Sequence, residues 1–500
     1  MIGKNLTVLF LTLVLFGCSK KEPNDFLRQP IVGIIQNSEV PILIKTIYKG
    51  KVRIEYKKAD ESSSTFTNWK MLSNSNALTT NLILSGLNYD TEYKYRVEFD
   101  EDSYSKWFNF KTFPTQGAPG KFNFVFSSCM REKYMSPYVF KDIAQISPTF
   151  VALLGDQMYG DYDGNLNKLE LYRNNDSIRQ AMVKKGEIIL KDKTVLQAFR
   201  SKYQRAFIKS FQKMSSSIPF VATWDDHDYG QDNSDGTYRY KEIAKKVFKE
   251  TYPTYPFEEK NGGLYYKYTI ANVDVFVLDT RWYRSPMQNK DEKGKTMLGE
   301  KQLLWLLDGL KQSTAPFKII FSSVSMNDYG GDTSSGRDGF DNWMGYTYER
   351  SKIYTFIDNN NIKGVLVFSG DQHFPSAHIL NWKNPLKYVS KTDSSIEYSL
   401  DNLGNAVFDF SSSPLNYKIS TGQPLIPANQ KNPKFSYEIF RPEWAKPEKV
   451  KQNDDMVITS VYGIVEIDTK SSLPNVLVKF YEINHETSKK VELYSVKVTY

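Results

Sequence analysis

The sequence contains very little cysteine and histidine. Among 500 residues there are two cysteines, Cys18 and Cys129, and four histidines. Two thiols cannot supply the disulfide framework that holds many small secreted domains together. A long hydrophobic run is also missing, since the apolar run at the start, Leu6 to Phe16, is too short to span a bilayer. These absences exclude a disulfide-rich scaffold and favour a large domain with a hydrophobic core.

No block of a single charge occurs either. There are 65 basic and 57 acidic residues, a net charge of +8, and the excess is spread along the chain in pairs such as Lys184-Lys185. Without an arginine-rich arm we expect no nucleic-acid partner. A solvated basic surface explains this balance, and a mild positive field would also favour anionic substrates.

The first residues have the form of a secretory signal. Lys4 precedes the apolar run, and Leu15-Phe16-Gly17-Cys18 resembles the bacterial lipobox, in which Cys18 is acylated and becomes the first mature residue. The alternative is an ordinary signal peptide with an incidental cysteine. We expect a signal peptide over 1–17, a tether over 18–29, and a membrane-anchored, extracytoplasmic lipoprotein. Cys129 would then be an oxidation liability unless it is buried or bound.

Residues 30–113 lack helical periodicity and contain short alternating stretches, which predict a small β-sandwich. The stretch Leu84 to Val97 resembles the tyrosine corner of fibronectin type III domains. A turn-rich linker, residues 114–120, marks the domain boundary. The expected strands are Val40 to Ile47, Lys51 to Lys57, Asn81 to Leu84, Glu92 to Phe99 and Trp107 to Phe113.

Buried-type strands alternate with helical stretches from Lys121 onward, which predicts an α/β domain over 121–500. The polar residues 160–193 are interpreted as an insertion near the mouth of the site. Near the C-terminus, Tyr462 to Ile467 and Asn475 to Tyr481 alternate like a hairpin that closes the sheet. The expected helices are Ser136 to Ala144, Thr194 to Met214, Lys241 to Glu250 and Gly299 to Gln312.

Several apolar runs of this domain end in chemically active side chains. The run Phe150 to Leu154 reads as a buried strand that stops at Gly155, and open α/β sheets place their chemistry at such ends. Runs beginning at Phe124, Pro219 and Gly364 end in the same way. Together they predict one metal site from Cys129, Asp156, Tyr159, Asp226, His227, Asp228, Asp371 and His373.

Longer stretches around these positions resemble the PhoD-like branch of the calcineurin-like metallophosphoesterases. The sandwich is also similar to the domain that precedes the catalytic domain in this family. The resemblance implies a four-layer αββα catalytic domain and a monomeric hydrolase of phosphate monoesters, diesters or both, with a metal-bound hydroxide as nucleophile. The matching stretches cover most of 121–380 and are Ser127 to Cys129, Leu154 to Asp161, Thr223 to Gly230, Leu278 to Arg284, Met297 to Gln302, Trp343 to Arg350 and Leu366 to His373.

The resemblance also implies two adjacent metals that share Asp156. Cys129, Asp156, Tyr159 and His373 would hold one metal, and this donor set suits Fe(III). Asp156, Asp226 and Asp371 would hold the other together with water, and oxygen ligands suit Ca²⁺ better than Zn²⁺.

One departure from the family pattern supports this choice of metals. Related phosphatases place another histidine after the strand that matches Lys318 to Val324, where this chain has Asn327. The other histidines, His378 and His485, do not complete a site that needs several imidazoles. His378 is interpreted as structural more readily than functional.

Roles in the reaction follow from the same positions. His227 would stabilise or protonate the leaving oxygen, with Asp228 as an orienting partner. Arg281 would clamp a phosphate oxygen, with Arg284 as a weaker candidate; the alternative for Arg281 is a surface salt bridge. Trp343 and Tyr346 either shape the pocket or pack.

Other readings compete with this one. One alternative is a cysteine phosphatase with Cys129 as its nucleophile. Such enzymes place an arginine six residues after the nucleophile, but Cys129 has Met135 at that spacing, which argues against this chemistry. A phospholipase or phosphodiesterase specialised for lipid or polymer diesters would use the same centre. A non-catalytic lipoprotein that serves as an adhesion or binding module is the alternative from another functional class.

Overall fold

The computed structural model describes residues 26–100, 103–161, 192–253, 256–328, 341–380, 395–418, 436–445 and 458–500. The expected signal peptide, Cys18 and almost all of the 160–193 insertion lie outside these residues. Within the described ranges, none of the helices combines the length and the apolar character that a bilayer crossing requires.

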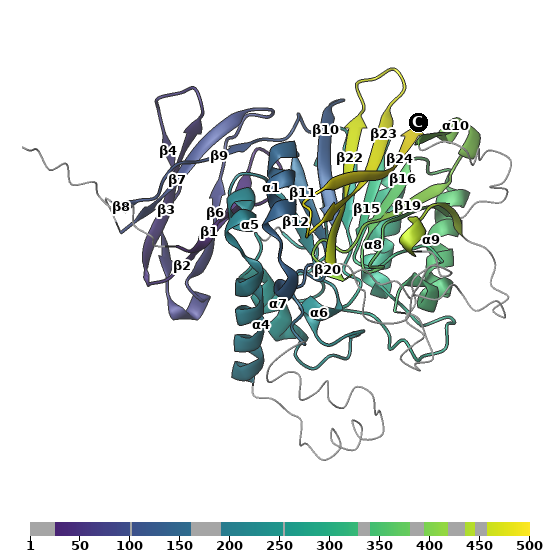
Figure 1. Cartoon of the computed structure of the whole chain (residues 1–500), viewed down its shortest axis with the longest axis horizontal. Helices are drawn as coiled ribbons and strands as arrows, with labels where there is room; N and C mark the ends of the chain where they lie inside the picture. The colour runs from purple at the N-terminus through teal and green to yellow at the C-terminus, as the bar shows by residue number, and fades with distance from the viewer. Residues whose placement is uncertain are drawn as a thin grey trace, which may run out of the picture.

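The N-terminal part folds as two small antiparallel sheets (Figure 1). Val52 and Ile54 of the larger sheet and Leu82 and Leu84 of the smaller one are buried in a shared core. The larger sheet contains β3 (Gly50–Lys58), β4 (Thr65–Phe66), β5 (Lys70–Leu72), β7 (Glu92–Phe99), β8 (Ser103–Tyr104) and β9 (Phe108–Lys111). The smaller contains β1 (Phe26–Val32), β2 (Val40–Thr46) and β6 (Thr79–Leu84), and a 3-10 turn (Asn74–Asn76) precedes β6.

The five strands expected here are all present. Buried and exposed side chains alternate in β9, as the sequence indicates, whereas β2 is buried along almost its whole length. β1, however, begins at Phe26, inside the expected tether. It pairs with β2 through Phe26 and Thr46, which places the tether's last residues in the sandwich.

The larger, C-terminal part contains two sheets that face each other. Phe124 and Phe150 of the first sheet pack against Phe321 of the second, with ring centroids 5.6 and 6.4 Å apart. The first sheet runs β12 (Phe220–Thr223), β11 (Phe150–Leu154), β10 (Lys121–Ser127), β22 (Ile458–Asp468), β23 (Asn475–Asn484), β24 (Lys490–Thr499) and β18 (Ser395–Ser399), with β20 (Tyr417–Lys418) beside β22. The second runs β13 (Tyr266–Ile270), β14 (Val273–Val277), β15 (Lys318–Ser322), β16 (Val365–Ser369), β19 (Val407–Ser411), β17 (Ser376–Leu380) and β21 (Ser436–Phe440).

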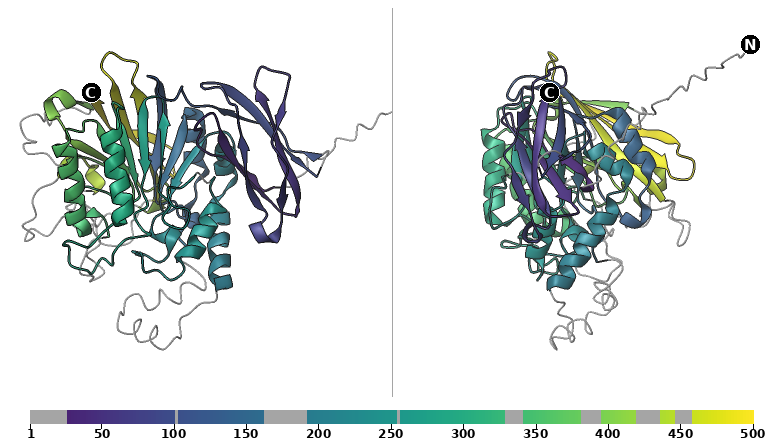
Figure 2. Two further views of the ribbon diagram at one scale, coloured as in Figure 1. Left: turned by 180° about the vertical axis from the view of Figure 1, so that it is seen from behind. Right: turned by 90° about the vertical axis from the view of Figure 1, so that its left-hand side faces the viewer.

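Helices cover the outer face of each sheet, as the views of Figure 2 show. On the first sheet lie α1 (Pro137–Ile146), α4 (Asp192–Ala206), α5 (Lys209–Ser215) and α7 (Lys241–Lys249); on the second lie α8 (Gly299–Gln312) and α9 (Thr347–Asn359). The four-layer αββα arrangement is therefore confirmed. Short helical turns within the described residues are Glu132–Tyr134, α6 (Asp226–Tyr229), Trp343–Tyr346, α10 (Leu400–Leu403) and Glu443–Ala445.

The expected single helix from Thr194 to Met214 is wrong. Ile208 takes an extended backbone with ψ 160°, which ends α4 and starts α5 in a new direction. The change of direction lets the Phe211 ring pack against Phe140 and Phe220, at centroid distances of 5.2 and 5.5 Å. The tertiary packing of this ring thus overrides a pattern that is compatible with one long helix.

The C-terminal hairpin joins the first sheet of this part, as expected. β22 pairs antiparallel with β10, with Lys121 opposite Asp468, and β23 pairs with β22. A further strand that was not expected, β24, pairs with β23 and extends the sheet toward β18.

Candidate metal centre

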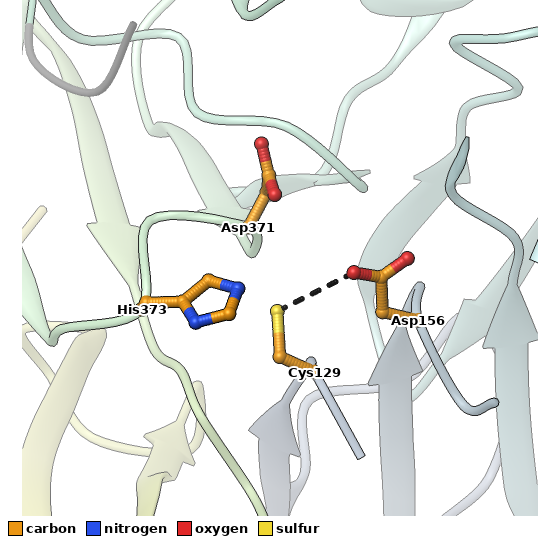
Figure 3. A group of neighbouring side chains, drawn as sticks. All are labelled: Cys129, Asp156, Asp371 and His373. Atoms are coloured by element: carbon orange, nitrogen blue, oxygen red, sulfur yellow. Dashed lines mark hydrogen bonds between the residues drawn. The ribbon is translucent and has the colours of Figure 1, made fainter. Parts of the chain in front are cut away.

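Cys129, Asp156, Asp371 and His373 converge at the carboxyl ends of β10, β11 and β16 (Figure 3). Each offers one ligand atom, and these atoms all lie within 4.8 Å of one another. The Cys129 Sγ is 3.7 Å from Oδ2 of Asp156. Because β10 and β11 are parallel neighbours and β16 belongs to the facing sheet, the site forms where both sheets meet.

All four residues have a left-handed backbone. Their φ angles are 58° for Cys129, 56° for Asp156, 68° for Asp371 and 59° for His373. A residue other than glycine held in this region costs about 1–3 kcal/mol, and such residues cluster at functional sites. This shared conformation marks the four positions as a functional constellation.

Hydrogen bonds between these turns hold the strained backbone in place. The amide of Cys129 donates to the carbonyl of Gly155 at 3.2 Å. The amide of Asp371 donates to Oγ of Ser128 at 3.0 Å, and the amide of His373 donates to Oγ of Ser413 at 2.6 Å. Each turn therefore depends on a neighbouring turn, so the four positions form as one unit.

The glycines that precede the two aspartates are required by space. Gly155 has φ 99°, and a Cβ there would lie 2.4 Å from Cβ of Asp225. A Cβ on Gly370 would lie 2.5 Å from Oγ of Ser128. In the sequence, these glycines appear only as strand terminators; the structure shows that the backbone must also approach other strand ends closely.

Burial and mutual repulsion disfavour the charged forms of the candidate ligands. Burial raises the pKa of Asp156 and Asp371 well above the usual range, and neighbouring carboxylates such as Asp226 raise both further. Burial, followed by the charges of Asp156 and Asp371, raises the pKa of the Cys129 thiol in the same way. A bound cation reverses these effects, so a thiolate, carboxylate and imidazole donor set at one point fits a metal.

A second group joins the first through Asp156. One ligand atom each of Asp156, Asp226 and His227 lies within the same 4.8 Å limit. Burial would raise the pKa of Asp226, but the charges of His227 and Arg281 hold it below its ordinary value. This grouping differs from the expected ligand sets. Asp371 was expected beside Asp226 but groups with Cys129 and His373, and His227 takes the place beside Asp226.

Tyr159 reaches this centre through its ring. The ring is buried, stacks on Tyr417 at 5.0 Å and lies 4.1 Å from the His227 ring. Burial raises the pKa of Tyr159 well above its usual value, and the adjacent Cys129 thiol and Asp156 carboxyl raise it further. These contacts place Tyr159 between the two groups.

Tyr417 and Arg131 are additional residues near the centre that sequence reasoning missed. The Tyr417 ring meets the His373 ring edge-on at 4.9 Å, and the Arg131 guanidinium lies 5.5 Å from the Tyr417 ring and 5.8 Å from the Tyr159 ring. Tyr417 lies on the short strand β20, far along the chain, and no local pattern marked it.

Asp161, rather than Asp228, contacts the His227 ring. Nδ1 of His227 lies 2.6 Å from Oδ1 of Asp161, and Nε2 lies 3.7 Å from Oδ1 of Asp232. Burial would lower the pKa of His227, but the carboxylates of Asp161, Asp226 and Asp156 raise it well above the ordinary value. A raised pKa favours the protonated ring, in which Nδ1 would donate to Asp161. Asp161 lies in the stretch Leu154 to Asp161, so its proximity to the motif was the available signal.

Asp228 turns away from the ring, which corrects its expected role as the orienting partner. Its carboxylate accepts hydrogen bonds from the amides of Asp225 and Gln157 and from the Tyr203 hydroxyl, at 3.1, 3.1 and 2.9 Å. Burial raises the pKa of Asp228 to about 7. Asp228 therefore ties the turn after β12 to the turn after β11.

Arg281 is fully buried in a carboxylate network, so the alternative of a surface salt bridge is wrong. Its Nε donates to Asp225 at 2.6 Å, its other nitrogens donate to Asp341 at 2.9 and 2.6 Å, and one also donates to the Ser234 carbonyl at 3.1 Å. Arg284 donates to the same Asp341. These contacts support a role in holding the Asp225–Asp226 turn rather than in clamping phosphate.

The remaining candidates have structural contacts. Trp343 donates from Nε1 to Ser322, and the Tyr346 hydroxyl donates to the Ser285 carbonyl, so both pack. His378 is fully buried on β17, 3.8 Å from Glu438. His485 lies 2.8 Å from the Ser460 hydroxyl. Asn327 accepts from Gln372 at 2.8 Å, beside Asp371.

The family model described as PhoD-like phosphatase matches residues 124–470, which include every residue of the centre. The chain belongs to the PhoD-like phosphatase family. A second model, the N-terminal domain of purple acid phosphatase, matches residues 41–112 of the sandwich.

Relatives of known sequence or structure agree with this assignment. Alkaline phosphatase D of Bacillus subtilis (strain 168) is 27% identical over 327 residues, in a match that covers 59% of this chain. The match spans about half the length of that relative, 52%. A solved structure of PhoD superposes with a TM-score of 0.62 at 18% identity, covering 94% of this chain and 92% of the other. The purple acid phosphatase PPD1 of yellow lupin (Lupinus luteus) gives 0.60 at 12% identity, covering 94% and 74%; both likenesses show the shared fold.

Proposed function

We propose that the protein is a metal-dependent hydrolase of phosphoric esters. The observation that carries this proposal is the convergence of Cys129, Asp156, Asp371 and His373, all in the left-handed conformation, at the ends of facing sheets. Membership of the PhoD-like phosphatase family supports it. A protein that served only as an adhesion module would not need four strained, buried ligand positions at one point.

The donor set favours two unlike metals. Cys129, Asp156, Tyr159 and His373 would hold Fe(III), and Asp156 and Asp226 would hold Ca²⁺. Asp371, the third oxygen ligand expected for Ca²⁺, groups with Cys129 and His373 and would have to reach the second ion from there. Bound there, the ions would neutralise phosphate oxygens and lower the pKa of a bound water. Elemental analysis after native purification tests this assignment, as does the visible absorption band expected from tyrosinate on ferric iron. Two equivalents of zinc and no iron would contradict it.

The chain's own contribution to the reaction centres on His227. With Nδ1 held by Asp161, Nε2, which lies 3.7 Å from Oδ1 of Asp232, would give a proton to the leaving oxygen of the ester. Burial lowers the pKa of His227, and the Asp161 carboxylate, which is not a candidate metal ligand, raises it and so favours the protonated ring. Asp161 therefore acts as a positioning residue for His227.

Phosphate monoesters, phosphate diesters or both are the proposed substrates. Turnover of p-nitrophenyl phosphate and bis-p-nitrophenyl phosphate by metal-loaded protein separates the two activities. Phospholipid and nucleotide esters in the same panel test the more specialised reading, a diesterase for lipids or polymers. Absence of hydrolysis across the whole panel would contradict the proposed function.

The cellular setting is a separate proposal. A lipid on Cys18 would anchor the protein at the extracytoplasmic side of a bacterial membrane, and we expect a monomer. Mass spectrometry of the mature N-terminus identifies the acyl group, and Cys18→Ser should release the protein from membranes. A Cys18→Ser variant that is processed and retained like the wild type would contradict the anchor.

A further inference from the structure

A cavity of about 350 Å³ lies between the sandwich and the catalytic domain. Arg28 of β1 and Lys45 of β2 line it from one side, and Arg200, Tyr203 and Glu250 line it from the other. Figures 1 and 2 show the sandwich beside α4 and α5 at this junction. The volume is at the lower end of the range for small-molecule sites, about 300–1,000 Å³.

The lining of this cavity contains more positive than negative charge. Arg200 and Glu250 neutralise each other through two hydrogen bonds of 2.7 Å. Arg28 is buried, yet it donates to the backbone carbonyls of Glu250 and Thr251, at 2.9 and 2.7 Å, and therefore contacts no carboxylate through these bonds. Its guanidinium also lies over the Phe207 ring at 4.2 Å. The nearby Glu250 carboxylate offsets the charge of Arg28 only in part, because it is already paired with Arg200.

Lys45 supplies the second unbalanced charge. Its ammonium makes no hydrogen bond or ion pair with any residue that the structure describes, although it lines the cavity. Burial, and then the nearby charge of Arg28, lowers the pKa of Lys45 to about 8. Burial also lowers the pKa of Arg28 to about 10. Burial therefore disfavours the charged forms of both side chains, and a bound anion would stabilise these charged forms.

The neighbouring surface has the same sign of charge. An open groove of about 410 Å³ shares Glu250 with the cavity and is lined by Lys245, Lys246, Lys249 and Lys260 against a single further carboxylate, Glu242. Clefts lined by one sign of charge raise the local concentration of the opposite ion. The groove would thus draw anions toward the cavity.

We propose that the cavity is a binding site for a small phosphate-class oxyanion, with Lys45 and Arg28 as its cationic contacts. A phosphate dianion matches the two unbalanced charges, and the forked guanidinium suits its oxygens. The site is distinct from the metal centre, because none of the candidate metal ligands lines it. It therefore does not depend on the proposed function.

Tyr203 connects the cavity to the metal centre. Its side chain lines the cavity, and its hydroxyl donates to Oδ1 of Asp228 at 2.9 Å. Asp228 in turn accepts from the amide of Gln157, the residue after Asp156. An occupant of the cavity therefore lies one side chain away from the turns that position the candidate ligands.

Isothermal titration of inorganic phosphate into the full, metal-loaded chain tests the proposal. We expect the wild type to bind one phosphate more than Lys45→Met, or to bind it at least about tenfold more tightly, since a charge-assisted contact is lost. Lys49→Met removes an exposed charge from the same domain and should behave as the wild type. Lys45→Arg should retain the binding.

Hydrogen exchange locates the bound ion. Phosphate should slow amide exchange in residues 26–32 and 192–206 of the wild type and leave these segments unchanged in Lys45→Met. A repeat with methylphosphonate, which a phosphatase does not cleave at its C–P bond, separates the two sources. Binding of phosphate alone assigns the site to the inorganic ion, and binding of both extends it to phosphoryl groups of esters.

The contrary result is equally clear. Identical phosphate stoichiometry and affinity in the wild type and Lys45→Met, without protection of residues 26–32, would overturn the proposal. Turnover of p-nitrophenyl phosphate should be unchanged in Lys45→Met, because Lys45 is absent from the metal centre. Failure of this site and failure of the proposed function are therefore seen in different measurements.

Discussion

The carboxylate of Asp161 lies 2.6 Å from Nδ1 of His227, and both side chains are buried. This contact orients Nδ1 toward Asp161 and raises the pKa of the ring, although burial alone would lower it. Asp161 therefore influences both the orientation of the His227 ring and the pH at which the ring releases its proton.

Asp161→Asn should lower kcat by about 10–100-fold while the metal content stays unchanged, as is typical when an orienting partner is lost. Without the carboxylate, His227 releases its proton at lower pH. The alkaline decline of activity should therefore move to lower pH. Asp235→Asn, on a neighbouring turn, is the control, and an Asp161→Asn variant with an unchanged pH profile would contradict the positioning role.

Substitution of Asp156 is expected to remove metal binding, whereas substitution of His227 is expected to remove turnover alone. Asp156→Ala should lose both metals, because Asp156 belongs to both ligand groups. His227→Ala should keep them and lose turnover by about 10²–10⁴-fold, the usual contribution of a general acid. Elemental analysis alongside kinetics tests both variants, with Asp308→Ala on the exposed side of α8 as the control. Loss of one metal in His227→Ala would make His227 a ligand instead.

Arg281 should matter first for stability. Arg281→Met leaves Asp225 and Asp341 buried without their cation, and breaking such a pair typically costs about 3–5 kcal/mol. Arg53→Met removes the half-exposed pair with Glu98 and should cost at most about 1 kcal/mol. Urea denaturation measures both. A stable Arg281→Met protein with only a raised KM would restore the phosphate clamp.

Gly155 should tolerate no side chain. Gly155→Ala adds a Cβ 2.4 Å from Asp225 at φ 99°, so the turn that carries Asp156 must move. We expect loss of metal binding together with a lower free energy of unfolding. Gly86→Ala shares the positive φ, 70°, but meets nothing within 4 Å, and should cost only about 1 kcal/mol. Equal effects of the two substitutions would show that backbone strain, rather than space, decides.

Lys45 should make stability depend on pH in the alkaline range. The charged groups facing it are Arg28, Glu250 and Arg200, and burial lowers its pKa from 10.5 to about 8. Below about pH 8 the ammonium is charged in both states and destabilises the fold. Between about pH 8 and 10.5 the unfolded chain binds more protons, so stability rises with pH.

Lys45→Met should therefore be more stable than the wild type at about pH 7, and the difference should close by about pH 10. Urea denaturation of both proteins measures the difference, with Lys49→Met as the control. A difference that is independent of pH would show that the folded-state pKa of Lys45 is close to its ordinary value.

Local sequence patterns predicted most of the elements. The alternation from Glu92 to Phe99 and the helical pattern from Gly299 to Gln312 became β7 and α8 with the expected bounds, because each pattern matches one period of backbone geometry. The break at Ile208 was not predictable in this way. It depends on where the Phe211 ring packs, against residues distant along the chain.

The sequence alone determined which types of ligand side chain the centre contains. Apolar runs that end at Cys129, Asp156 and Asp371 indicate strand ends with metal-ligand side chains. The parallel pair β10 and β11 brings the first two ends to one edge, and Asp371 comes from the facing sheet. The tertiary structure decided the partnerships: Asp161 rather than Asp228 beside His227, Arg281 within a carboxylate network, and Tyr417 against His373. Tertiary structure alone determines such contacts, because they join turns from separate strands and no local spacing records which turns will meet.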